Sequence, residues 1–284
     1  MSNIPNIQQA AVVQNPGPNP TILLRDNIAV GEPVRALLKY GVYNPIIGHE
    51  GVGIVVKSGS NVSLSLLNKR VGVKWLYNAC NQCSVCQRGF VHNCPKQLNT
   101  SRHVPGTLQQ YALADARFLT RIPDGLADEI AAPLLCAGLT MAGALSQLDK
   151  ELQAGDWVVI SGSGGGLGHV GVQIASRVQK FRVIGIDTGD DKRKISFESG
   201  VTAFIDFRTE DVAARVLQLT GEGAHATVVV PGKKEAFRTA PSVVRNMGHI
   251  ILVGLPENTF ELPISASVCS ARGEWLRLSF SRLY

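Results

Sequence analysis

The region between residues 156 and 256 constrains the fold most, because strand-like and helix-like segments alternate in it. Apolar runs rich in Val and Ile, such as DWVVISG and FRVIGID, are separated by segments with a helical period. In the first helical segment, LGHVGVQIASRVQK, the residues Leu167, Val170 and Ile174 share one helical face. Strands that alternate with helices form parallel sheets covered on both faces. We therefore predict an α/β unit with a doubly wound parallel sheet.

A glycine-rich turn, SGSGGGLG, joins the first of these strands to the first helix. Such glycines let the backbone approach a pyrophosphate at the positive end of the helix. Asp187 ends the next strand, where an acid accepts hydrogen bonds from a ribose and disfavours a 2′-phosphate. Ser163 replaces the first glycine of the G-x-G-x-x-G pattern, whose other glycines are Gly165 and Gly168. The arrangement predicts a dinucleotide-binding unit that prefers NAD to NADP.

The segment CNQCSVCQRGFVHNC carries four cysteines, Cys80, Cys83, Cys86 and Cys94. Four thiolates at this spacing can surround one tetrahedral zinc ion and leave no open coordination position. Such a structural zinc would hold together a lobe that has little core of its own. Two local disulfides, or thiols without a ligand, are the alternatives. His92 is expected to be a surface residue of the lobe.

The chain before this sheet is predicted to form a β domain. Apolar bursts such as AAVV, TILL and GVGIVV are short and are separated by Gly, Pro and Asn. Short strands with no long helical period predict a partly closed barrel. The segment DEIAAPLLCAGLTMAGALSQL then predicts linking helices. The predicted parts are a β domain at 1–125, linking helices at 126–155, the parallel sheet at 156–268 and a divergent tail at 269–284.

Three further residues are candidate ligands of a catalytic zinc ion. The segment IIGHEGVGIV places His49 beside Glu50 in a Gly-rich turn, and LLCAGLT carries Cys136. Imidazole, thiolate and carboxylate all bind catalytic zinc, which keeps one position open for water or substrate. A lone cysteine in a helix is more often a small buried apolar residue. Spacing alone leaves both interpretations of Cys136 open.

Composition and charge exclude several classes of protein. A content of 45% hydrophobic and 18% charged residues is typical of a globular chain with a core. The net charge of +6 is scattered, so we predict no nucleic-acid partner. The N-terminus shows no secretory pattern, and we expect no apolar run to be long enough to span a bilayer. We expect a cytoplasmic protein without a membrane partner, in which clustered cysteines hold metal.

Taken together, GHEGVGIV, the four-cysteine segment, LCAGLT, SGSGGGLG and GID resemble the zinc-dependent medium-chain alcohol dehydrogenases, in particular their microbial ethanol-type branch. The similarity runs from the N-terminus to about Val268. It implies a GroES-like β domain that carries the metals and a Rossmann domain that carries NAD. It also implies reversible hydride transfer between NAD and a primary or secondary alcohol, with zinc as the Lewis acid.

The resemblance also assigns roles to residues. His49 and Cys136 would bind the catalytic zinc, Glu50 would be able to swing onto it, and the four clustered cysteines would hold the structural zinc. The implied cofactor contacts run from the pyrophosphate to the nicotinamide. They are Gly165, Gly166 and Leu167 at the pyrophosphate turn, Asp187 and Lys192 at the adenosine ribose, Phe207 beside the adenine, and Val253 and Leu255 near the nicotinamide.

The chain departs from the family pattern in two places. Where the family has Gly-Val-Cys-His-Thr/Ser-Asp, this chain has KYGVYNPIIGHE, so that Tyr43 follows Gly41-Val42 and leads almost directly to His49. The residues without a counterpart are a zinc-binding cysteine, a hydroxyl residue and a histidine of the proton relay, and a supporting aspartate. After Val268, CSARGEWLRLSFSRLY stands in place of the family's sixth strand and its return to the first domain.

These departures leave alternatives open. The sheet is expected to lack its last strand and to expose an edge that the family uses to pair subunits. Alternatively, Leu276, Leu278 and Phe280 alternate with polar residues and could form a makeshift strand. The chain is expected to be an alcohol dehydrogenase or, as the alternative, a catalytically impaired NAD-binding protein with only the structural zinc. Two zinc ions per chain favour the enzyme, and one favours the binding protein.

Overall fold

The computed structural model describes residues 7–13, 22–29, 46–256 and 277–280. They form two compact units, an N-terminal unit up to residue 136 and a C-terminal unit from residue 137. The division falls inside the predicted linking segment at 126–155. The finer boundaries at residues 125, 155 and 268 remain predictions.

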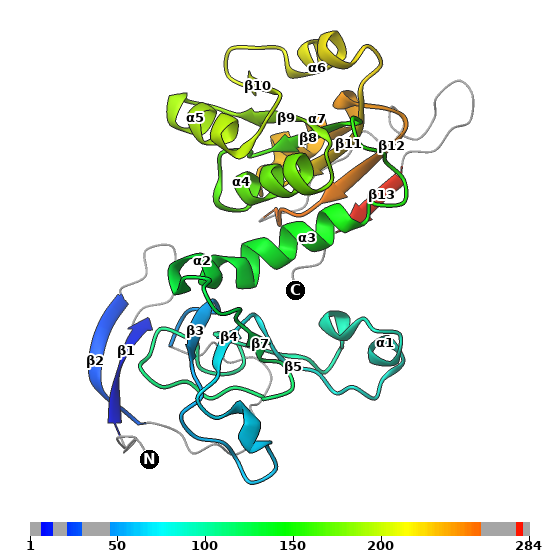
Figure 1. The fold of residues 1–284 in the computed structure, drawn as a ribbon. Helices are drawn as coiled ribbons and strands as arrows, with labels where there is room; N and C mark the ends of the chain where they lie inside the picture. The colour runs from blue at the N-terminus through cyan, green and yellow to red at the C-terminus, as the bar shows by residue number, and fades with distance from the viewer. Residues whose placement is uncertain (1–6, 14–21, 30–45, 257–276, 281–284) are drawn as a thin grey trace. The chain divides into compact units, whose positions relative to one another are not determined.

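The C-terminal unit is built on a six-stranded parallel sheet with the order β10-β9-β8-β11-β12-β13, as Figure 1 shows. Numbered along the unit, this is the order 3-2-1-4-5-6 of the Rossmann fold, so the predicted fold class is confirmed. The strands are β8 (Trp157–Ser161), β9 (Arg182–Asp187), β10 (Ala203–Asp206), β11 (Ala224–Val229), β12 (Val244–Leu252) and β13 (Arg277–Phe280).

Helices cover both faces of this sheet. All residues of β8 are buried, with Val158 and Ile160 in one hydrophobic core and Trp157 and Val159 in the other. Successive side chains of a strand point to opposite faces, so two cores require two helical layers. The helices are α3 (Leu139–Ser146), α4 (Gly166–Gln173), α5 (Asp190–Ser199), α6 (Val212–Thr220) and α7 (Lys234–Val243).

The C-terminal tail supplies the sixth strand, so the sheet does not lack its last strand as we expected. β13 pairs in parallel with β12, and His249 lies opposite Arg277 while Leu252 lies opposite Phe280. The alternation of apolar and polar residues in the tail suits a strand, and pairing satisfies backbone groups of β12. The connecting residues 257–276, which include Cys269, lie outside the described residues.

The N-terminal unit consists of short antiparallel strands, as its Gly- and Pro-rich sequence predicts. They form a hairpin, β1-β2, a three-stranded sheet, β3-β4-β7, and a pair, β5-β6. The strands are β1 (Ile7–Val13), β2 (Ile22–Ala29), β3 (Gly51–Ile54), β4 (Arg70–Val73), β5 (Leu76–Asn78), β6 (Leu98–Asn99) and β7 (Thr120–Arg121). Two short helices, α1 (Ser84–Gln87) and α2 (Asp128–Pro133), accompany them.

One helical stretch, Asp128–Ser146, is long and apolar enough to cross a membrane, with a mean hydropathy of 1.4. This corrects our expectation that no segment reaches such a length. Length and composition are weak evidence here, because the core helix of a globular protein passes the same test. Met141 and Leu145 of this stretch are fully buried in the core of the C-terminal unit, and 39% of its apolar window is buried.

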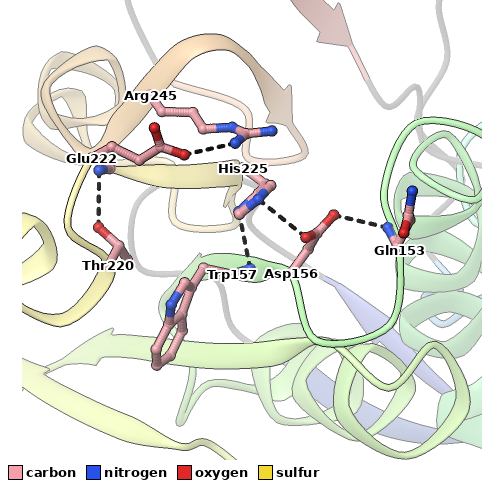
Figure 2. A network of polar contacts seen from close by, with 8 residues as sticks. Gln153, Asp156, Trp157, Thr220, Glu222, His225 and Arg245 are labelled. Carbon is pink, nitrogen blue, oxygen red and sulfur yellow. Dashed lines mark hydrogen bonds and ion pairs between the residues drawn. The ribbon is translucent and has the colours of Figure 1, made fainter.

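A polar network ties β8 to β11 at the ends of the strands opposite the glycine-rich turn (Figure 2). His225 Nδ1 accepts a hydrogen bond from the Trp157 N–H at 3.2 Å, and its Nε2 lies 3.1 Å from Asp156 Oδ1. Arg245 and Glu222 form an ion pair at 2.7 Å in the same network. Burial lowers the pKa of His225, although the Asp156 charge opposes this effect. The neutral imidazole therefore serves as both donor and acceptor.

The substitution His225→Gln is expected to remove part of the loss of stability on acidification. Since the pKa of His225 is lowered by folding from 6.5, the unfolded chain takes up its proton first as the pH falls. The neutral ring stabilises the fold above that pH, and this contribution is lost as the pH falls toward the lower folded-state pKa. Urea unfolding between pH 8 and pH 5 measures the effect.

Asp156→Asn is the matched control with the opposite sign. The Asp156 charge raises the pKa of His225, so its removal should lower the folded-state value further and steepen the dependence of stability on pH. For His225→Gln, a curve of unfolding free energy against pH that runs parallel to that of the wild type would contradict the prediction. It would show that His225 does not change its proton affinity on folding.

Candidate metal and cofactor sites

The four clustered cysteines lie at the separations that one tetrahedral ion requires. Cys80 Sγ is 3.5 Å from Cys94 Sγ and 3.9 Å from Cys86 Sγ, and Cys83 Sγ is 4.0 Å from Cys94 Sγ. Sulfurs bound to zinc at about 2.3 Å form a tetrahedron with edges of about 3.8 Å. A disulfide would need about 2.05 Å. The geometry therefore fits the tetrathiolate site and excludes disulfides among these four residues.

Local structure brings these thiols together. α1 begins directly after Cys83 and carries Cys86, and a 3₁₀ turn at Val91–Asn93 precedes Cys94. Backbone N–H groups of Gln82 and Cys83 lower the pKa of Cys80 to about 6, whereas burial raises the pKa of Cys86 to about 12. A bound dication would offset the repulsion between four neighbouring thiolates and keep all of them deprotonated.

The lobe has little hydrophobic core apart from the cysteines. Cys94 has no exposed surface, and the small cluster around it contains Ala79 and the partly buried Val91 and Phe118. His92 lies outside the group of ligand atoms, and its ring packs edge-on against Phe90 with 6.1 Å between the centroids. A metal would therefore supply much of the cohesion of this lobe.

The structure also brings His49, Glu50 and Cys136 together, although 87 residues separate the first from the last. His49 Nε2 lies 3.4 Å from Cys136 Sγ, and a Glu50 oxygen lies within 4.8 Å of both atoms. Zinc bound to nitrogen at about 2.05 Å and sulfur at about 2.3 Å places those ligands about 3.6 Å apart. His49 and Cys136 are partly buried and Glu50 is exposed. The three donors fit a zinc site with an open side.

A second loop holds the His49 turn in place. Gly48 has a positive φ of 95°, and Thr107 N–H donates to its carbonyl at 2.9 Å. Gly106 N–H donates to Ile46 O at 2.8 Å, and a Cβ at Gly106 would lie only 2.3 Å from the Ile47 backbone. Residue spacing does not predict this loop, because nothing in VPGTL indicates which distant segment it pairs with.

Two further features orient the metal-site side chains. The His49 ring packs edge-on against Trp75 with 5.2 Å between the ring centroids. Cys136 lies in a π-helical turn, Leu134–Gly138, that directly follows Pro133. Such turns occur mostly as single-turn insertions in α-helices and are frequent at functional sites. Neither feature can be read from residue spacing.

The glycine-rich turn between β8 and α4 has the tight backbone that its sequence predicts. Gly162 has a φ of +72°, and Gly165 N–H donates to its carbonyl at 2.9 Å. A Cβ at Gly168 would lie 1.9 Å from that same carbonyl oxygen, whereas a Cβ at Gly166 would meet nothing within 4 Å. The first N–H groups of α4 have no acceptor within the helix and can serve a pyrophosphate.

Ser163 fits the first glycine position because its side chain points away from the turn. The residue is fully buried, and its Oγ lies 2.7 Å from Ser196 Oγ. Its φ is not positive, so no glycine is needed there. A Cβ at Gly185 would lie 2.6 Å from the Ser163 Oγ, so a glycine on the neighbouring strand makes room for the hydroxyl.

Asp187 and Lys192 lie beside the glycine turn, and their ribose-binding role remains a prediction. Asp187 Oδ2 accepts a hydrogen bond from Gly164 N–H at 2.9 Å, and its Oδ1 accepts one from Thr188 N–H at 3.0 Å. Lys192 Nζ donates to Gly164 O at 3.1 Å. A carboxylate has about four acceptor positions, so Asp187 can still accept hydrogen bonds from a ribose diol.

The other implied cofactor residues follow the carboxyl ends of strands, where ligands of this fold bind. Phe207 follows β10 and is 51% exposed, and Leu255 is 68% exposed. Val253 follows β12, but its side chain is only 2% exposed and packs in the hydrophobic core. Only its backbone is available to a ligand. The roles of these three residues remain predictions.

The substitution Cys94→Ser is expected to remove one zinc ion per chain and to destabilise the N-terminal unit. Losing a thiolate leaves a buried tetrahedral shell incomplete in a lobe without another core. Metal analysis after gel filtration, together with thermal unfolding, measures both effects. Cys136→Ser is the matched control and should keep that ion. Equal zinc content in Cys94→Ser and the wild type would contradict the assignment.

The substitution Gly168→Ala is expected to destabilise the C-terminal unit by about 1–3 kcal/mol, because its methyl group overlaps the Gly162 carbonyl oxygen. Gly166→Ala, on the same helix, has open space around its Cβ and should leave the stability unchanged or slightly higher. Urea unfolding of both variants measures the difference. Equal effects would show that the close approach of Gly168 and Gly162 does not constrain the turn.

Comparisons with known proteins match both units. The model of the alcohol dehydrogenase GroES-like domain matches residues 25–124, and the model of the zinc-binding dehydrogenase domain matches residues 166–274. Alcohol dehydrogenase 2 of Emericella nidulans is 44% identical over 74% of this chain, and an alcohol dehydrogenase of Schizosaccharomyces pombe is 38% identical over 75% of it. The match covers 60% of each relative.

Among solved structures, the alcohol dehydrogenase of the archaeon Aeropyrum pernix superposes with a TM-score of 0.73 at 25% identity. That match covers 84% of this chain and 68% of the archaeal one. The two domain models match in the order in which the described units occur, and the curated relatives carry one common description. The chain therefore belongs to the family of zinc-dependent medium-chain alcohol dehydrogenases.

Proposed function

We propose that this protein is an NAD-dependent alcohol dehydrogenase that interconverts primary or secondary alcohols with aldehydes or ketones. The observation that carries the proposal is the contact between His49 Nε2 and Cys136 Sγ at 3.4 Å. A nitrogen donor and a sulfur donor from distant segments lie at the separation expected for two ligands of one tetrahedral ion, and the Glu50 carboxylate lies beside them. A partly buried lone cysteine without a metal role has no need of such a neighbour.

His49 and Cys136 would hold the catalytic zinc. A zinc ion there supplies Lewis acidity that lowers the pKa of an alcohol hydroxyl, and NAD supplies the hydride acceptor. Trp75 fixes the plane of the His49 ring. Glu50 is exposed, so its carboxylate can complete the donor set or take up the proton that the alcohol releases.

The C-terminal unit would bind the cofactor. The first N–H groups of α4 would donate hydrogen bonds to the pyrophosphate beside the glycine turn, and Asp187 and Lys192 would hold the adenosine ribose. The Asp187 charge favours NAD over NADP, because it repels a 2′-phosphate. A small alcohol is the substrate class that the family relationship supports. We also propose a cytoplasmic protein with neither nucleic acid nor membrane as a partner.

The donor set for the catalytic zinc is smaller than the family pattern. The described residues contribute one imidazole, one thiolate and one carboxylate to it, and KYGVYNPIIGHE contains no cysteine. Residues 30–45, which include Gly41, Val42 and Tyr43, lie outside the described residues. Replacing a thiolate by a carboxylate weakens the preference for zinc, so we propose a zinc ion that exchanges more readily than the structural one.

The deciding experiment measures NADH formation by the purified chain with a panel of primary and secondary alcohols at pH 8, with and without added zinc. Activity is expected, and His49→Gln should reduce it at least about a hundredfold, because it removes a metal ligand. His225→Gln, a histidine substitution in the polar network of Figure 2, is the matched control and should retain the rate.

Metal analysis of the same samples separates the two candidate functions. Two zinc ions per chain together with turnover support the dehydrogenase. One ion, NADH binding and no turnover with any alcohol would contradict the proposal and leave a cofactor-binding protein with a structural zinc.

A further inference from the structure

A second carboxylate stands beside Asp187 at the proposed ribose site. Asp206 ends β10 and lies directly opposite Asp187, which ends the neighbouring parallel strand β9. Adjacent strands are about 4.8 Å apart, so the two acids share one edge of the sheet. This is the carboxyl edge, where ligands of the fold bind. The proposed function assigns no role to Asp206.

The Asp206 side chain holds the turn that follows Asp187. Its Oδ2 accepts a hydrogen bond from Gly189 N–H at 3.3 Å, and the Thr188 hydroxyl also donates to the carboxylate. Its Oδ1 accepts a hydrogen bond from Arg208 N–H at 3.0 Å. Gly189 has a positive φ of 91° and precedes α5, the helix that carries Lys192. Asp206 therefore positions the backbone between two proposed ribose contacts.

Asp206 also balances the positive charge at this edge. The Arg208 N–H and the Thr188 hydroxyl hold the pKa of Asp206 below its usual range, and the charge of Arg193 contributes. Arg193 is itself held over the Phe204 ring, with its guanidinium carbon 4.8 Å from the ring centroid. A fixed guanidinium is a good partner for phosphate, so it would attract a 2′-phosphate if Asp206 did not oppose it.

We infer that Asp206 is a positioning residue for the ribose-binding turn and a second determinant, besides Asp187, of the preference for a dinucleotide without a 2′-phosphate. The inference rests on the proposed cofactor site. Loss of the Asp206 charge removes a hydrogen-bond acceptor of the turn and leaves Arg193 unbalanced. The affinity for nucleotides with a 2′-hydroxyl then falls. The affinity for nucleotides with a 2′-phosphate rises relative to that for nucleotides with a 2′-hydroxyl.

The test is calorimetric titration of the full chain with 5′-AMP and with 2′,5′-ADP, which differ in the 2′-phosphate. Asp206→Asn is expected to lower the ratio of the dissociation constant of 2′,5′-ADP to that of 5′-AMP about fivefold, since a 2′-phosphate carries about two charges near the exposed Arg193 guanidinium. If Asp206 had a purely structural role, its loss would weaken the binding of both ligands equally and leave the ratio of their dissociation constants unchanged. Adding Arg193→Gln to Asp206→Asn should restore the wild-type ratio.

Asp211→Asn is the matched control. Asp211 caps α6 by accepting a hydrogen bond from Ala214 N–H, and asparagine caps a helix equally well. It should leave the ratio unchanged, and an equal change in this control would overturn the inference. Arg193→Gln alone gives a second measurement if Asp206→Asn does not fold. It should raise the ratio, and an unchanged ratio would also overturn the inference.

The outcome for the wild type separates the two proposals. If the wild type binds 5′-AMP or NADH but Asp206→Asn keeps the wild-type ratio, only the role of Asp206 is wrong. If the wild type binds neither nucleotide, the proposed cofactor site is wrong, and the role of Asp206 falls with it.

Discussion

The contact between His49 and Cys136 is the constraint on which the functional interpretation depends. It joins the turn before β3 to a helical turn 87 residues later, at a separation that suits a metal ion. Neither side chain reaches this position by local preference. Backbone hydrogen bonds from the loop at 106–108 hold the first turn, and a π-helical turn after Pro133 carries the second residue. The loop at 106–108 and the π-helical turn thus bring the two donors together.

The two groups of candidate metal ligands have different structural roles. The four-cysteine cluster replaces a hydrophobic core, because the lobe around Cys94 buries few other side chains. Its ligands come from one short segment, so the loop that zinc closes is short and its geometry is locally determined. The His49 cluster instead requires an open coordination side and an exposed carboxylate. Its ligands come from separate segments, and it has fewer soft donors. A zinc ion held there would therefore be lost to a chelator before the structural one.

Several departures from the family pattern have structural compensations. Ser163 turns its hydroxyl toward Ser196, and the glycine at position 185 makes the space for it. β13, formed by a tail of unfamiliar sequence, occupies the edge of the sheet next to β12. The absent cysteine near Tyr43 has no such counterpart among the described residues, apart from the Glu50 carboxylate. Function is therefore more sensitive to these departures than the fold.

Local spacing in the sequence determined the parts of this protein whose partners lie near each other along the chain. The four-cysteine cluster, the glycine turn with Asp187 and the alternation of strands and helices are all of this kind, because residue spacing controls which atoms meet within a turn or a strand. Tertiary structure alone decided the rest. The support of His49 by Gly106 and Thr107, the burial of Val253 and the burial of Met141 and Leu145 all depend on contacts between distant segments. Chain spacing carries no information about which distant segments meet, since packing of the whole unit selects among many compatible partners.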